Sequence, residues 1–165
     1  MAHISLSPKF IKEVFLLFRK KSLKELIFGK TVSLAPPEQE LMRWIENHPD
    51  DFVRAGGRKG NFLRIDPIHK GTGMVYLLPN RLGDTTRESI LIFDPHTKIT
   101  QGPDLWVYLI KHVGSGEFLN LGLLKGTKGG QAYVIPKPLI DLTRYQSTAI
   151  WCKQFAVLFS YAVLE

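Results

Sequence analysis

The most reactive side chain that this sequence encodes is that of Cys152, the only cysteine among 165 residues. It lies in the C-terminal stretch STAIWCKQFAVLFSYAVLE. A single cysteine excludes an intramolecular disulfide, and it excludes a zinc or iron–sulfur site built from several thiolates of this chain. Two roles remain for Cys152: a reactive thiol that carries the function, or a small buried residue of a core strand.

The residues around Cys152 predict a single strand that continues to the end of the chain. Side chains alternate between the two faces of a strand, so Lys153 points away from the face of Cys152. Both predicted faces are largely apolar, which indicates a central strand covered on both sides. An apolar environment disfavours the thiolate, so the local sequence favours the structural role. The face of Cys152 comprises Ile150, Gln154, Ala156 and Leu158, and the other face comprises Trp151, Phe155, Val157 and Phe159.

Other combinations of residues that could do chemistry are weak. The FGKT stretch at residues 28–31 ends like a phosphate-binding loop, but Lys24 stands where that loop needs its first glycine. The GTKGGQ stretch is expected to be a hairpin turn. The five histidines do not occur at metal-ligand spacing, and Asp66, Asp94 and Asp104 lie in predicted turns. No catalytic constellation is visible, so we do not expect an enzyme, and we expect no bound metal.

A basic amphipathic segment at the N-terminus is the second feature with functional content. The net charge of the chain is +7. Residues 1–34 contain seven Lys/Arg and two Glu, a net +5, which leaves +2 for the rest. Ser7 and Pro8 are a typical helix start, and the apolar residues that follow recur every three or four positions. The candidate partner-binding residues are Lys9, Phe10, Lys12, Phe15, Phe18, Arg19, Lys20, Lys21 and Lys24.

Two interpretations of this segment are open. It packs on the protein's own sheet with its lysines in solvent, or it is an arm that docks on a partner. The aromatic stripe and the separation of the segment from the β region favour docking on an acidic protein assembly or an anionic membrane surface. Nucleic acid is a less suitable partner, because the basic residues alternate with a hydrophobic face.

The elements that must position these residues fall into two regions. We expect a helical arm and linker over residues 1–59 and an antiparallel β-sandwich or barrel-like domain over residues 60–165, a mainly β fold. A further helix is expected to begin near Pro36 and to end before His48-Pro49, and the RAGGRKG stretch (54–60) is expected to be the linker. The expected strands are GMVYLLP, ESILIF, LWVYLI, FLNLGLL, QAYVIP and the C-terminal run.

No apolar run is long enough for a transmembrane helix, and the N-terminus does not have the pattern of a secretory signal. From this we expect a cytoplasmic protein.

From Gly60 onward the chain resembles the DM-thirteen domain family. The resemblance rests on an ordered series of blocks: GNF, HKGTG, GPDLWVYL, LGLLKGTKGGQAYVIP and LTRYQSTAIWCKQFAVLF. It implies a β-sandwich-like domain in which Cys152 is a signature residue with a redox role, as a free thiol or as the ligand of a prosthetic group such as haem. His69 and Met74 lie in or beside the HKGTG block, and the resemblance makes either a candidate second ligand.

Two functions follow as expectations. The preferred one is a non-catalytic adaptor whose basic aromatic arm docks on its partner while the β domain serves as a rigid module. The alternative is a redox or electron-transfer protein centred on Cys152. We expect no cofactor in the first case; in the second, Cys152 is either a free thiol or the ligand of a prosthetic group such as haem.

Overall fold

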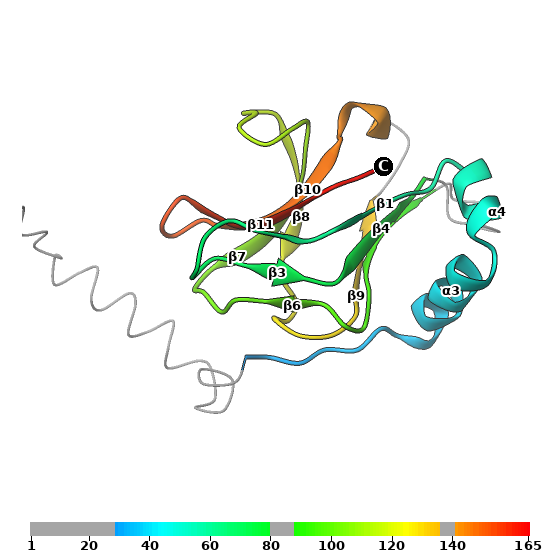
Figure 1. The fold of residues 1–165 in the computed structure, drawn as a ribbon, viewed down its shortest axis with the longest axis horizontal. Helices are drawn as coiled ribbons and strands as arrows, with labels where there is room; N and C mark the ends of the chain where they lie inside the picture. The colour runs from blue at the N-terminus through cyan, green and yellow to red at the C-terminus, as the bar shows by residue number, and fades with distance from the viewer. Residues whose placement is uncertain (1–28, 80–87, 136–140) are drawn as a thin grey trace, which may run out of the picture.

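The computed structural model describes residues 29–79, 88–135 and 141–165, and Figure 1 shows two antiparallel sheets with a pair of helices beside one of them. The mainly β, antiparallel fold class predicted from the sequence is confirmed. The predicted helix within residues 1–28 lies outside the described part of the chain, and so do the arm residues assigned to partner binding.

Two helices precede the strands. Helix α3 (Pro36–Asn47) has proline in its first turn and ends at the C-cap His48, as the sequence predicted. Helix α4 (Pro49–Arg54) follows directly. Met42, Ile45 and Phe52 are buried on these helices. The pair therefore presents one apolar side to the rest of the molecule.

The first sheet has four strands in the order β1-β4-β5-β9, all antiparallel. They are β1 (Arg58–Asn61), β4 (Met74–Leu78), β5 (Ser89–Phe93) and β9 (Gln131–Ile135). Every residue of β5 is buried. Its outward residues Ile90 and Ile92 pack with Met42, Ile45 and Phe52, so α3 and α4 cover the outer face of this sheet.

The second sheet has five strands in the order β2-β11-β10-β7-β8, also antiparallel. They are β2 (Leu63–Arg64), β7 (Leu105–Ile110), β8 (Phe118–Leu123), β10 (Ser147–Cys152) and β11 (Val157–Val163). A small ribbon of β3 (Gly71–Thr72) and β6 (Lys98–Ile99) and a 3₁₀ turn η1 (Leu142–Arg144) complete the described elements.

The main core lies between the two sheets. Val75, Leu77 and Phe93 from the first sheet meet Val107, Ile150 and Phe159 from the second. At one edge of the sandwich the chain passes directly from β1 of the first sheet to β2 of the second, so the two sheets are continuous at this edge. Lys59 and Glu165 exchange backbone hydrogen bonds of 2.9 Å there. Gly60 is required at this edge, because a Cβ would lie 1.9 Å from the carbonyl oxygen of Val163. The sandwich is therefore closed like a barrel on this side.

The C-terminal run corrects one prediction. It forms a hairpin and not a single strand, because the chain turns at residues 153–156 and Ala156 adopts a φ of 51°. Cys152 and Ile150 share the core face as expected. Beyond the turn the phase is inverted: Phe159 packs in the core with Cys152, whereas Leu158 packs on the outer face. Alternation could not reveal this, since both faces are apolar.

The predicted linker also differs from the structure. Arg58 to Asn61 form β1 and pair with β4, and Gly57 lies under the Phe52 ring, where a Cβ would be 2.3 Å from a ring carbon. The predicted boundary between residues 59 and 60 therefore falls inside a strand. The helices of residues 36–54 pack on the first sheet.

The GTKGGQ stretch is not a hairpin turn. It connects β8 of the second sheet to β9 of the first, and these two strands do not pair with each other. Lys128 instead forms isolated bridges with Thr31 and with Lys98. Gly129 allows the close approach, because a Cβ would lie 2.0 Å from the carbonyl oxygen of Val32. The glycines therefore serve contact with the segment around Val32.

Candidate functional site around Cys152

Cys152 is the last residue of β10 and lies between Leu105 of β7 and Val157 of β11. Its exposed fraction is 0%, and it belongs to the core between the sheets. The thiol donates a hydrogen bond of 3.0 Å to the carbonyl oxygen of Pro103. The sulfur is thus enclosed, and among the described residues its polar contact is with the loop that leads into β7.

That loop is built around an unusual backbone position. Asp104 has a φ of 54°, which is rare for a residue other than glycine. Its carbonyl oxygen accepts from the backbone N–H of Lys153 at 3.1 Å, and its carboxylate accepts from Nε1 of Trp106 at 2.7 Å. These bonds hold the Pro103 carbonyl beside the end of β10. The loop and the residues around Cys152 therefore form one hydrogen-bonded unit.

Lys153 points away from the sulfur, as the alternation indicated. Its ammonium lies over the Trp106 ring, 3.5 Å from the centroid, on the outer face of the second sheet. Such a contact contributes about 0.5–1 kcal/mol at exposed sites. Lys153 therefore packs on the Trp106 ring and does not contact the thiol of Cys152.

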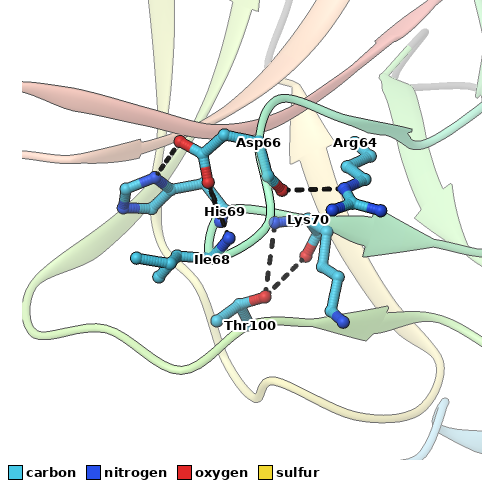
Figure 2. A network of polar contacts seen from close by, with 6 residues as sticks. All are labelled: Arg64, Asp66, Ile68, His69, Lys70 and Thr100. Atoms are coloured by element: carbon cyan, nitrogen blue, oxygen red, sulfur yellow. Dashed lines mark hydrogen bonds and ion pairs between the residues drawn. The ribbon is translucent and has the colours of Figure 1, made fainter.

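His69, a candidate second ligand, is held in the loop between β2 and β3 (Figure 2). Its Nδ1 lies 2.6 Å from Oδ2 of Asp66, and Oδ1 of Asp66 accepts from the backbone N–H groups of Ile68 and His69. The side-chain hydrogen bond with His69 lowers the pKa of Asp66 to about 2. The His69 ring meets the Phe159 ring edge-on at 4.6 Å between centroids.

His69 and Cys152 are therefore linked only through intermediate residues. Phe159 packs against Gly102, where a Cβ would lie 2.4 Å from a ring carbon, and Gly102 precedes the Pro103 that accepts from Cys152. The structure places the imidazole on the aromatic ring and not on the sulfur.

Met74, the other candidate ligand, lies on the wrong face of its sheet. In β4, Val75 and Leu77 belong to the core with Cys152, so Met74 shares the opposite face with Tyr76. The Tyr76 hydroxyl donates to the Met74 sulfur at 3.5 Å. Met74 and Cys152 are separated by the sheet.

These positions do not fit a haem held by Cys152. The sulfur is fully covered and its S–H is bonded to a carbonyl, and neither candidate second ligand faces it. Across the described residues, no group of three or more His, Cys, Asp or Glu side chains could hold a metal ion.

Sequence reasoning missed a buried polar network near the crossover from β8 to β9. The Tyr133 hydroxyl donates to Oε1 of Gln131 at 2.7 Å and accepts from the backbone N–H of Lys125 at 3.1 Å. Burial raises the pKa of Tyr133 well above its ordinary value. The alternation of QAYVIP places Gln131 and Tyr133 on one face, which is the signal that could have indicated this pair.

A second aromatic cluster covers the outer face of the five-stranded sheet. Tyr108, Ile110 and Ala149 are buried there. The Phe118 ring stacks on Tyr108 at 4.7 Å. The partly buried members of this cluster are Trp106, Trp151, Leu158 and Tyr161. Trp151, the residue next to Cys152 in the chain, thus reaches the surface of this face.

The fold and the site define a β-sandwich protein with one thiol enclosed between its sheets. Residues 61–164 match the family model described as electron transfer DM13, and the chain belongs to this family. The resemblance noted from the sequence is thereby confirmed. No curated protein and no solved structure matches the chain. Within the described residues, none of the helices is both long and apolar enough to cross a membrane.

Proposed function

We propose that this protein takes part in electron transfer and that Cys152 is the group on which this role depends. The observation that carries the proposal is the enclosure of Cys152: a fully buried thiol in the family span, bonded to the Pro103 carbonyl. The family match favours this function over the adaptor that the sequence alone preferred.

The enclosure determines how an electron leaves the sulfur, because a reduced thiol can only be oxidised: it would give one electron to an oxidised redox partner and release its S–H proton. A small oxidant in solution cannot collide with a side chain that is 0% exposed. Exchange must therefore pass through packed protein, and Trp151 supplies a short route because it directly precedes Cys152 in β10 and reaches the outer aromatic cluster. A redox partner would contact that face of the second sheet.

The test compares the full-length protein with Cys152→Ala by protein-film voltammetry. We expect a redox wave in the wild type that is absent from Cys152→Ala. Val53→Ala is the matched control, since Val53 is 65% exposed on α4, and it should keep the wave. An identical wave in Cys152→Ala, or no wave in the wild type, would contradict the proposal.

The thiol should also react slowly with Ellman's reagent in the native protein and rapidly after denaturation. Rapid reaction in the native state would show that the sulfur is open to solvent, contrary to the route through packed protein.

The adaptor function remains a second candidate, favoured by the net +5 of residues 1–34. Thr31 bridges to Lys128 and Leu34 is buried with the helices, so a truncation that tests the arm must spare residues from 29 onward. Substitution tests the arm without removing residues that contact the domain. Phe10→Ser, Phe15→Ser and Phe18→Ser combined in the full-length protein should abolish capture of the protein's partner from the source cell. Unchanged capture would exclude a role for the arm.

A further inference from the structure

One end of the sandwich combines exposed apolar side chains with basic ones. Two connections meet there: the loop at residues 65–70 between β2 and β3, and the turn at residues 153–156 between β10 and β11 (Figure 1). Ile68 is 68% exposed, Phe155 55% and Ile65 39%. These three side chains, with Arg64, Lys70 and Lys153, are called the tip surface below.

The strand register places the two connections at the same end of the second sheet. Arg64 pairs with Ser160, and Leu63 pairs with Tyr161. The residues that follow Arg64 therefore lie toward the start of β11 and the turn before it. The contact of His69 with Phe159 holds the loop against β11 at this point.

Hydrogen bonds within the loop at residues 65–70 fix its conformation. The backbone N–H groups of Ile65 and Asp66 both donate to the His69 carbonyl, at 2.9 and 3.2 Å. The Asp66 carboxylate receives the backbone N–H groups of Ile68 and His69. In Figure 2 only the backbone N–H of Ile68 takes part in this network, and its side chain makes none of the dashed contacts. The internal bonds of the loop therefore hold a large apolar side chain that is 68% exposed.

The charge around these apolar side chains is basic. The one acidic residue of the loop, Asp66, is engaged by the His69 side chain at 2.6 Å and by two backbone N–H groups. Asp104, behind the turn, is bonded to Trp106. Arg64, Lys70 and Lys153 flank the tips, so the surface favours a partner that is both apolar and anionic.

Further lysines continue this basic surface along the β3–β6 ribbon. Lys98 and Lys128 lie directly opposite each other, which is unfavourable for like charges. Both are exposed, and neither forms an ion pair within the described part of the chain. Lys98 lies two residues before Thr100, which is hydrogen bonded to Lys70 (Figure 2).

The first described residue, Gly29, lies close to the Thr100–Lys70 contact. A Cβ on Gly29 would lie 2.9 Å from Nε2 of Gln101, the residue after Thr100. Thr100 in turn exchanges hydrogen bonds with the backbone of Lys70. The described chain therefore begins near Lys70, and residues 1–28 carry most of the positive charge of residues 1–34.

We propose that the tip surface docks on an anionic lipid bilayer, with Ile65, Ile68 and Phe155 entering the interface and the flanking basic residues contacting the headgroups. Exposed apolar side chains at loop ends, surrounded by basic residues in a chain whose N-terminal segment is also basic, match both the apolar and the negative layers of such a surface. This docking is independent of the redox role of Cys152.

The test is co-sedimentation of the full-length protein with vesicles of phosphatidylcholine alone or mixed with phosphatidylserine. We expect binding to the mixed vesicles that weakens as salt rises. Ile68→Ser combined with Phe155→Ser should reduce the partition coefficient about tenfold or more, since two large apolar side chains no longer enter the interface. Lys70→Ser should reduce it about fivefold, the effect of one basic residue near an anionic surface.

The controls remove similar side chains elsewhere. Val53→Ser lies on α4 and Lys59→Ser on β1, at the other side of the molecule in Figure 1, and both should leave binding unchanged. Circular dichroism should show that all variants are folded.

Three results would overturn the proposal. The first is wild-type protein that fails to bind the mixed vesicles. The second is an Ile68→Ser/Phe155→Ser double variant that binds the mixed vesicles as strongly as the wild type. The third is equal binding to both kinds of vesicle, which would exclude an anionic partner. If the tip variants bind normally and only the combined Phe10, Phe15 and Phe18 variant loses binding, the N-terminal segment alone is responsible and the tip surface has no part in it.

Discussion

The two sheets of the sandwich differ in what lies on their outer faces. The outer face of the first sheet is covered by α3 and α4, so that β5 is buried along its whole length. The outer face of the second sheet carries partly buried aromatic side chains, of which Trp106 and Trp151 belong to neighbouring strands. Within the described residues no helix covers that face. The first sheet is therefore packed on both of its faces at β5. The second sheet packs on the core, where Cys152 lies, with one face and exposes part of its aromatic side chains on the other.

This difference separates stability from function. Substitutions at the covered face should cost free energy of unfolding, whereas substitutions at the open face should cost less and affect contacts with a partner. The following predictions test that separation, beginning with the largest expected effect.

Phe52→Ala should lower the free energy of unfolding by about 3–5 kcal/mol, because it removes a buried aromatic ring that packs between α4 and the first sheet. Urea denaturation measures the change. The control Val53→Ala, at an exposed position of the same helix, should change it by less than about 0.5 kcal/mol. A small effect of Phe52→Ala would mean that the helices are not an integral cover.

Cys152→Ser should lower the free energy of unfolding by about 1–3 kcal/mol, since it places a more polar group in an apolar core. The same urea experiment on Cys152→Ala separates the loss of packing from the cost of the hydroxyl. If serine is as stable as cysteine, the hydrogen bond to Pro103 compensates fully, and the site is more polar than its neighbours suggest.

Trp106→Phe should lower the free energy of unfolding by about 1 kcal/mol, because it removes the hydrogen bond to Asp104 but keeps an aromatic ring under Lys153. Thermal unfolding followed by circular dichroism measures it. A loss as large as that of Phe52→Ala would show that the open face contributes as much stability as the covered one.

The smallest expected effect is the pH dependence due to Asp66. Its folded-state pKa, lowered to about 2 by His69, lies below the ordinary value of 3.8. Its contribution is therefore complete above about pH 4 and is lost as the pH falls through about 2. The stabilities of the wild type and Asp66→Asn, measured by urea denaturation between these limits, should converge at the acidic end. A constant difference would mean that the carboxylate is not held by His69.

Much of the β architecture could be predicted from the sequence, because its longer strands are continuous apolar runs bounded by turn residues. GMVYLLP, ESILIF, LWVYLI, FLNLGLL and QAYVIP all contain strands. Strands β2, β3 and β6 are two residues long, too short for any periodicity, and β1 (RKGN) is polar and glycine-containing. Their pairing is fixed by distant partners, which local patterns do not contain.

The site was predictable only in part, for a similar reason. Alternation placed Cys152 in the core and Lys153 on the opposite face, and both positions agree with the structure. The acceptor at Pro103 lies 49 residues away along the chain, and the separation of Met74 from Cys152 depends on which face of β4 meets the second sheet. Neither the acceptor of the Cys152 thiol nor the face on which Met74 lies can be predicted from the residues that neighbour Cys152 or Met74 in the sequence.

The pairing of β2 with β11 sets the order in which this fold can assemble. Leu63 and Arg64 find their partners at Tyr161 and Ser160, almost a hundred positions later in the chain. Such distant contacts carry a large loop-closure cost before they stabilise anything, and folding slows as they increase. On the ribosome, β2 must wait unpaired until β11 has emerged, so the second sheet closes only after nearly all of the domain has been synthesised.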